Sequence, residues 1–206
     1  MYALVEDNNI TQIITNPKTM VIGDVRYPAK IFQLWSQSEL NAIGIYEVVT
    51  DSSNFKDEKW YINTDESYSF ADNQVTRSWG TATPKAHADS LWTQEDSDDG
   101  DLPDDKEVGD VKVEGLKTQL IRTLKSQVAG ILSNTDWYIT RNTEKSTAIP
   151  SSISTYRDAV RTKQAEMETA ITNASDTPAL ETLYTYTTDS DGVQSRPLGE
   201  LPTLEI

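Results

Sequence analysis

The chain has 206 residues, a formal net charge of −15 and a mean hydropathy of −0.55. With only 36% hydrophobic residues, it predicts one or two small domains with small cores and much exposed chain. The lack of cysteine excludes disulfides and thiolate metal sites, and the acidic balance argues against a nucleic-acid partner. We expect no signal peptide and no membrane span, and therefore a soluble protein made in a cytoplasm, because MYALVEDNN has no basic or apolar region and no apolar run is long enough.

The first segment, residues 2–14, reads YALVEDNNITQII and predicts a β-hairpin. Its two apolar runs flank Asp7-Asn8-Asn9, residues that favour turns and tolerate positive φ. Residues 25–35 are a further extended candidate, interrupted at Pro28. Ser36 then has the chemistry of a helix N-cap, and Gly44 ends the short helix that we expect there.

More strands are expected before residue 85. Residues 45–49 alternate between apolar and polar side chains as a half-buried strand does. Residues 59–62 and 68–79 supply further strand candidates, and Asp72-Asn73 divides the second of them into a hairpin. Residues 1–85 are therefore predicted to form a small β-rich module.

An acidic segment follows, over residues 86–112, and we expect it to be an exposed linker that its own charge repulsion keeps extended. It contains ten acids and one lysine between residues 89 and 110, which gives −9 of the chain's net charge. The spacing does not match a calcium loop, because Lys106 stands where the final glutamate is required when Gly100 takes the glycine position. A solvated spacer is the favoured interpretation, and weak, nonspecific binding of divalent cations is the alternative.

The period of the apolar residues changes to that of helices after the acidic segment. Stripes at spacings of three and four predict helices over residues 113–133 and 151–174, the second behind Pro150. Their similar lengths predict an antiparallel helical hairpin over 113–175, followed by an extended C-terminal tail over 176–206. The predicted fold class is thus α+β.

The connector between the predicted helices begins TDWYITRN and contains two adjacent aromatic residues, Trp137 and Tyr138. The favoured interpretation is that both rings fold back and cover the apolar end of the hairpin, because isolated helices of this length need packing to persist. The alternative is that they are exposed and bind a partner, since tryptophan and tyrosine are frequent interface hot spots.

Catalytic chemistry is sparse in this sequence. His87 is the only histidine and stands beside the acidic segment, where a solvated side chain is expected. No glycine-rich phosphate loop and no His/Glu metal motif is present, and the many carboxylates stand where nothing would shift their pKa values. We therefore expect no enzyme activity, no catalytic residue, no metal site and no cofactor.

Two blocks of the sequence resemble phage tail-associated proteins of the tail-fibre-assembly, or tail assembly chaperone, family. The first is MYALVEDNNITQII followed by YPAKIFQLWSQSELNAIGIYEVV. The second, more specific block has a helix that ends near ILSNTDW, then a variable loop, then a helix with YRDAVR. The long acidic segment and the C-terminal extension depart from the family's usual pattern.

The resemblance implies a role in phage tail or fibre assembly, in the virion tail or in the host cytoplasm during assembly. The implied partners are tail, fibre or baseplate proteins, and a homo-oligomer is a further expectation. Neither nucleic acid nor a membrane is expected as a partner. The candidate partner-binding residues are Trp137, Tyr138, Tyr156, Arg157 and Arg161. Because Arg157 and Arg161 lie four residues apart on one helix, Asp136 can pair with one of them, or both arginines can be solvated.

Two alternatives to a transient assembly factor stay open. One is a permanent structural component of the tail, which the extra segments favour. The other is a host-surface or glycan-binding module, for which exposed aromatic rings would stack on sugars. The aromatic candidates for that role are Trp35, Trp60, Trp79 and Trp92, each of which is also a candidate core or linker residue.

Overall fold

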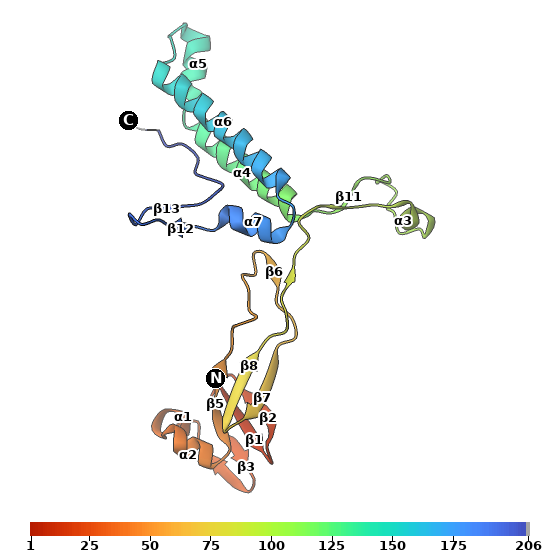
Figure 1. The fold of residues 1–206 in the computed structure, drawn as a ribbon, viewed down its shortest axis with the longest axis vertical. Helices are drawn as coiled ribbons and strands as arrows, with labels where there is room; N and C mark the ends of the chain where they lie inside the picture. Colours follow the sequence, from red (N-terminus) through yellow and green to blue (C-terminus); the bar gives the residue numbers. More distant parts are fainter. Residues whose placement is uncertain (205–206) are drawn as a thin grey trace. The chain divides into compact units, whose positions relative to one another are not determined.

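The computed structural model describes residues 1–204 and contains both helices and strands (Figure 1), so the predicted α+β class is confirmed. The chain divides into two compact units, Met1–Thr83 and Pro84–Ile206. None of the helices within residues 1–204 is long and apolar enough to cross a membrane.

The first unit is built on a five-stranded sheet with strand order β2-β1-β5-β8-β7. The strands are β1 (Tyr2–Glu6), β2 (Asn9–Ile14), β5 (Ile45–Thr50), β7 (Ser67–Ala71) and β8 (Gln74–Ser78). All neighbours are antiparallel except β5 and β8, which are parallel. Both predicted hairpin turns are confirmed: the φ angles are 50° and 62° at Asp7 and Asn8, and 52° and 58° at Asp72 and Asn73.

Two short helices, α1 (Ile31–Leu34) and α2 (Gln37–Ala42), lie between residue 27 and β5 in the sequence. The predicted cap of α2 is confirmed, because Ser36 and Glu39 form a reciprocal capping box. Gly44 follows with φ of +82°, and a side chain there would approach Val5 O to 2.6 Å. The remaining strands up to the unit boundary are β3 (Met20–Ile22), β4 (Val25–Tyr27), β6 (Tyr61–Ile62) and β9 (Thr83–Pro84).

Two strand predictions in this unit were too long. Residues 25–35 are extended only through β4, because the Pro28 carbonyl accepts a hydrogen bond from Ile31 N and starts α1. Residues 59–62 form a strand only in β6, because Trp60 N donates to Asp57 O and closes a turn before it. A local backbone turn prevailed over the apolar pattern in both places.

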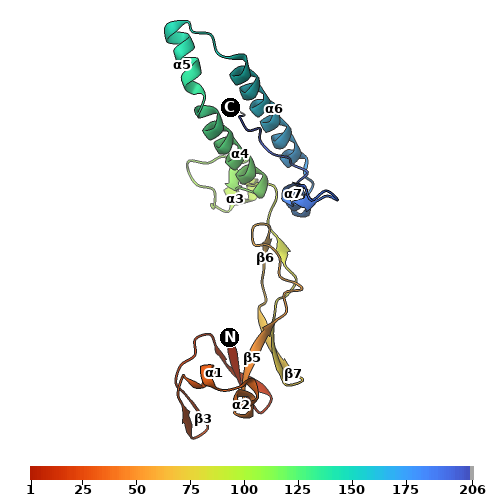
Figure 2. The same cartoon turned by 90° about the vertical axis from the view of Figure 1, so that its left-hand side faces the viewer.

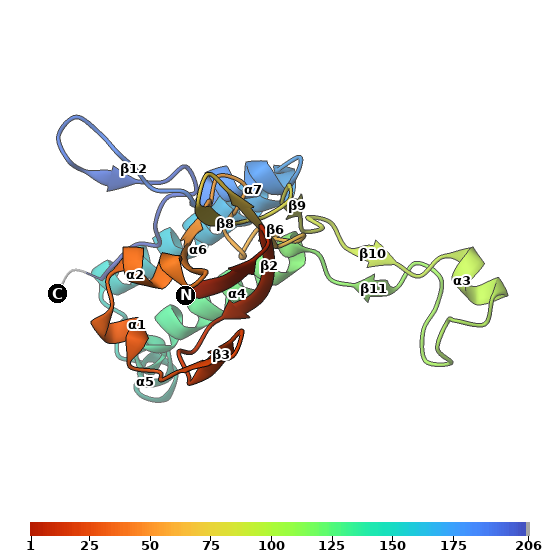
Figure 3. The ribbon, with the colours of Figure 1, turned by 90° about the horizontal axis from the view of Figure 1, so that it is seen from below.

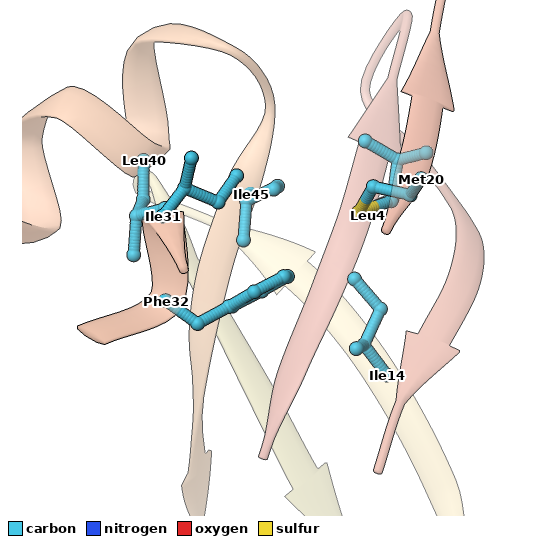
Figure 4. Close-up of a cluster of buried hydrophobic side chains, with 7 residues drawn as sticks. All are labelled: Leu4, Ile14, Met20, Ile31, Phe32, Leu40 and Ile45. Atoms are coloured by element: carbon cyan, nitrogen blue, oxygen red, sulfur yellow. The ribbon is translucent and has the colours of Figure 1, made fainter. Parts of the chain in front are cut away.

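The core of the first unit lies on both faces of β1, whose side chains alternate between two clusters. On one face, Leu4 packs with residues of α1, α2 and the neighbouring strands (Figure 4). On the other, Ala3 and Val5 pack with Val75 of β8. The seven buried residues of the larger cluster are Leu4, Ile14, Met20, Ile31, Phe32, Leu40 and Ile45.

The second unit is built on a pair of long helices, α4 (Leu116–Ser133) and α6 (Ser151–Asn173), which lie side by side in opposite directions (Figures 1 and 2). The predicted helices are confirmed, although α4 begins at residue 116 rather than 113. The apolar stripes of both helices are buried in their shared interface, as predicted. Its buried apolar residues include Leu116, Leu124, Val128, Ile153, Val160, Met167 and Ile171.

The start of α4 is held by a residue from the acidic segment. Gly115 is the N-cap and has no side chain to offer, and the Asp89 carboxylate takes its place. That carboxylate accepts hydrogen bonds from Gly115 N (2.6 Å) and Thr118 Oγ1 (2.8 Å). A negative charge at a helix N-terminus also opposes the positive end of the helix dipole.

The acidic segment is exposed along most of its length, as predicted, but the prediction that charge repulsion keeps it extended is wrong, because the chain folds back on itself there (Figure 3). Strands β10 (Ser90–Leu91) and β11 (Val111–Val113) pair antiparallel, and α3 (Gln94–Asp98) lies between them in the sequence. Asp96 completes a capping box with Thr93 and is paired with Lys112. These contacts lower the pKa of Asp96 from 3.8 to about 2. The hydrogen bond from Lys112 is the largest cause, and those from the Thr93 N–H and hydroxyl come next.

The predicted extended tail over 176–206 is also wrong in part. Residues 177–184 form α7 (Thr177–Tyr184), which the Asp176 side chain caps by accepting from Ala179 N at 2.8 Å. The short strands β12 (Thr187–Thr188) and β13 (Gln194–Ser195) pair after it. Leu198 is then buried, with its N–H bonded to Leu183 O. Residues 205–206 lie outside the described part of the chain.

Candidate functional site

The connector between α4 and α6 contains a further helix, α5 (Asp136–Lys145), where a loop was predicted. Asp136 lies in its first turn and Lys145 in its last, so both charges oppose the helix dipole. The helix ends at Ser146, whose φ is +51°. Side chains of the connector are therefore presented at fixed directions from a helix.

The break between α4 and α5 is held together by Arg157, which extends from α6. Its Nη1 donates to Leu132 O (2.8 Å) and Thr135 Oγ1 (2.6 Å), and lies 2.8 Å from Asp136 Oδ1. The last carbonyls of α4 have no partners within the helix, so the guanidinium supplies one. Because the Arg157 side chain is only 9% exposed, we assign it a structural role at this junction.

Of the two alternatives for Asp136, an ion pair with one of the arginines is the one that the structure shows, and Arg157 is the partner. Arg161 lies one turn further along α6, is exposed, and pairs instead with Asp158 at 3.2 Å. The two arginines share a helix face by sequence spacing, but only one reaches the junction.

Above the junction, α5 carries an exposed aromatic group that we call the tip patch: Trp137, Tyr138, Ile139 and Arg141. Trp137 is 50% exposed and Ile139 39% exposed, while Tyr138 is half-buried. The favoured prediction that both rings cover the apolar end of the helix pair is therefore wrong for Trp137. Helix α5 leaves half of the Trp137 side chain in solvent, while the adjacent Tyr138 is half-buried.

Arg141 completes the tip patch and was not singled out from the sequence. Its guanidinium carbon lies 4.7 Å from the Trp137 ring centroid and 5.4 Å from that of Tyr138, within cation–π range. The two rings are themselves 3.7 Å apart. Arg141 follows them by four and three residues, a spacing that would have indicated the contact had a helix been expected there.

The Arg141 Nε is buried and has no hydrogen-bond partner within residues 1–204. A buried donor without an acceptor costs free energy, so the position of this guanidinium is due to its packing against the two rings. The tip patch thus combines exposed apolar area with a guanidinium held against aromatic rings, the chemistry of a binding surface.

The other candidate residues are distributed elsewhere. Tyr156 is half-buried on α6 and does not join the stack of Trp137 and Tyr138. Among the tryptophans proposed for sugar stacking, Trp60 is buried at 3% exposure and is removed from consideration. His87 is half-buried, and no group of three or more metal-ligating side chains occurs in the described part of the chain.

No protein family, no curated protein and no solved structure matches this chain. Its function is therefore inferred from its own residues.

Proposed function

We propose that the chain is a bacteriophage tail-associated protein that acts by protein–protein binding, as an adaptor or assembly factor for a tail fibre or baseplate protein. It would act in the virion tail, or in the host cytoplasm during assembly, without catalysis. For this role we divide the chain into a β-rich module (1–85), an acidic linking segment (86–112), a helical hairpin (113–175) and a C-terminal tail (176–206).

The tip patch is the observation that carries this proposal. Half of the Trp137 surface faces solvent, and Arg141 adds a guanidinium packed against the Trp137 and Tyr138 rings. Tryptophan, tyrosine and arginine are the residues that dominate interface hot spots. An exposed cluster of all three is more readily explained by a partner than by the stability of the isolated chain.

The resemblance adds a second line of support, because its motif residues occupy connected positions. Asp136 from the first motif pairs with Arg157 from the second, and Trp137 follows Asp136 directly. In this interpretation the paired residues orient α5, and the tip patch makes the contact. Tyr156 and Arg161 then lie on the adjoining part of α6 as secondary contacts.

Co-expression with the candidate fibre protein tests this function. Trp137→Ala should lower the affinity at least ten-fold, since hot-spot truncations cost about 2 kcal/mol or more. Tyr186→Ala is the matched control, because Tyr186 is also an aromatic residue of unit 2 with 50% exposure. The proposal fails if fibre solubility and folding are indifferent to the protein and it is also absent from purified particles.

Mass spectrometry of gradient-purified particles separates a transient factor from a permanent component of the tail. A fixed copy number in the particle means that the chain is structural. Its absence from particles, together with a requirement during fibre folding, means that it is an assembly chaperone.

A further inference from the structure

The first unit contains a cavity of about 510 Å³ that the tip patch and the proposed function do not involve. It lies where the parallel strands β5 and β8 end, against the loop that leads to β6. The groups that line it and matter here are Thr50, Ser52, Phe55, Glu66, Arg77 and Trp79. Every one of them belongs to residues 1–83.

One side of the cavity is aromatic. Phe55 and Trp79 meet edge to face, with ring centroids 4.8 Å apart. Phe55 is 41% exposed although it is a large apolar residue, and Trp79 is half-buried. The two ring planes are inclined by 61°, so together they give an angled apolar wall that opens to solvent.

Next to the aromatic wall the lining is polar and ordered. Arg77 makes a two-point pair with Glu66, through Nε at 3.0 Å and Nη2 at 2.9 Å. The same guanidinium lies 4.5 Å from the Trp79 ring centroid, so it joins the polar wall to the aromatic one. Tyr68 donates a further hydrogen bond to Glu66, which fixes the carboxylate in place. Thr50 and Ser52 add hydroxyl groups at the rim.

Hydrogen bonds between asparagine side chains and the backbone order both walls without a ligand. The Asn54 side chain donates to Trp79 O at 3.1 Å. Asn63 closes the loop by accepting from Lys56 N (2.9 Å) and donating to Lys56 O (2.8 Å). A site whose walls are already ordered loses little conformational entropy on binding.

We propose that this cavity binds a neutral saccharide. A sugar ring presents a face of C–H groups, which packs on an aromatic wall, and an edge of adjacent hydroxyls, which pairs with carboxylate, guanidinium and hydroxyl groups. The cavity offers both within one space, in the usual proportion of apolar walls and few oriented polar groups. An anionic ligand is disfavoured, because the lining has two glutamates, Glu58 and Glu66, against one arginine and the chain carries −15 overall.

A purely apolar peptide side chain is a poorer occupant. It would take water from the Arg77–Glu66 pair without offering hydrogen bonds to the remaining N–H groups and lone pairs of that pair, and this desolvation costs free energy. The saccharide satisfies both walls at once. This inference does not depend on the tip patch or on a fibre partner.

Saturation-transfer NMR on the full chain tests the proposal with defined probes. These are the methyl β-glycosides of glucose, galactose and N-acetylglucosamine, and the β-1,4-linked trisaccharides of glucose and of N-acetylglucosamine. At least one probe should give saturation transfer at millimolar concentration, as expected for a shallow site. Transfer should be strongest at the C–H face that lies on Trp79.

Two variants locate the site. Trp79→Ala should weaken binding at least ten-fold, and Phe55→Ala, which alters only an exposed loop residue, should weaken it in the same direction. Trp137→Ala in the second unit removes an exposed ring of another surface and should leave saccharide binding unchanged. The proposal is overturned if no probe gives transfer, if Phe55→Ala retains the full signal in a folded protein, or if Trp137→Ala abolishes it.

Discussion

Replacing Arg157 by leucine should destabilise the second unit far more than the same replacement at Arg161, four residues away on the same helix. Leucine keeps the apolar packing of the arginine stem but removes all three contacts of Nη1. Leu132 O keeps its bonds from Thr135 N (3.0 Å) and Thr135 Oγ1 (2.9 Å) when Arg157 is lost. The Thr135 hydroxyl oxygen loses its donor, and Thr135 is only 2% exposed.

The magnitude follows from burial. Losing the hydrogen bonds of a buried guanidinium costs about 1–3 kcal/mol, and half-exposed Asp136 contributes only a small part because water can solvate it. Arg161 pairs with Asp158 at the surface, where both side chains are more than half exposed. Its replacement should therefore change the free energy of unfolding by about 0.5 kcal/mol or less.

Urea unfolding followed by far-ultraviolet circular dichroism measures both variants, because most helical residues belong to the second unit. The midpoint should fall strongly for Arg157→Leu with little change in the slope against urea. Equal shifts for the two variants would refute the structural role of Arg157. A near-neutral Arg157→Leu would do the same and would return this arginine to the binding surface.

Two other predictions concern the acidic segment and the start of α4. A Cβ at Gly115 would lie 2.3 Å from the Ala88 carbonyl group, so Gly115→Ala should lower the free energy of unfolding by about 1–3 kcal/mol. A Cβ at Gly130 of α4 would meet nothing within 4 Å, so Gly130→Ala should raise that free energy by about 1 kcal/mol. Thermal melts of the two variants should therefore shift in opposite directions; shifts of the same sign would contradict the geometry at Gly115. Because the pKa of Asp96 is lowered, the stabilisation from its charged form is complete above the unfolded value of 3.8 and is lost as the pH falls through about 2. An NMR titration of that carboxyl should have its midpoint near 2, and Lys112→Ala should raise it; a wild-type midpoint near 3.8 would mean that the Lys112 pair is not formed in solution.

Much of the fold was predictable because its signals are local. The turn at Asp7 and Asn8 and the cap at Ser36 each depend on a few consecutive residues whose backbone preferences agree with the final fold. The stripes of α4 and α6 gave both helices, since each buries one face against the other. Local preference and tertiary packing point the same way in all of these elements.

The misses have a common physical cause. Helix α5 has no continuous apolar stripe, because its partners are Arg157 and solvent rather than a core. The acidic hairpin depends on a pairing of Asp96 with Lys112, sixteen residues away, which a summed charge conceals. Helix α7 does have a start signal, because Asp176 caps it and Pro178 occupies its first turn, but its eight residues are too few to form a clear apolar stripe.

The candidate site was predicted only in part for the same reason. Residue type and spacing indicated an exposed Trp137 and a pair of Asp136 with Arg157 only as alternatives among others. Arg141 was not indicated, because its contact with the rings exists only once residues 136–145 are helical.

The hydrogen bond from Gly115 N to Asp89 joins the two ends of the hairpin formed by β10 and β11, at the N-terminus of α4. An insertion whose ends already meet changes the closure entropy of the chain only slowly with its length. The hairpin between them is therefore an exchangeable appendage: trimming residues 92–109 to a short turn should leave α4 and α6 paired. Length and charge can therefore be changed at this position while the helices stay the same.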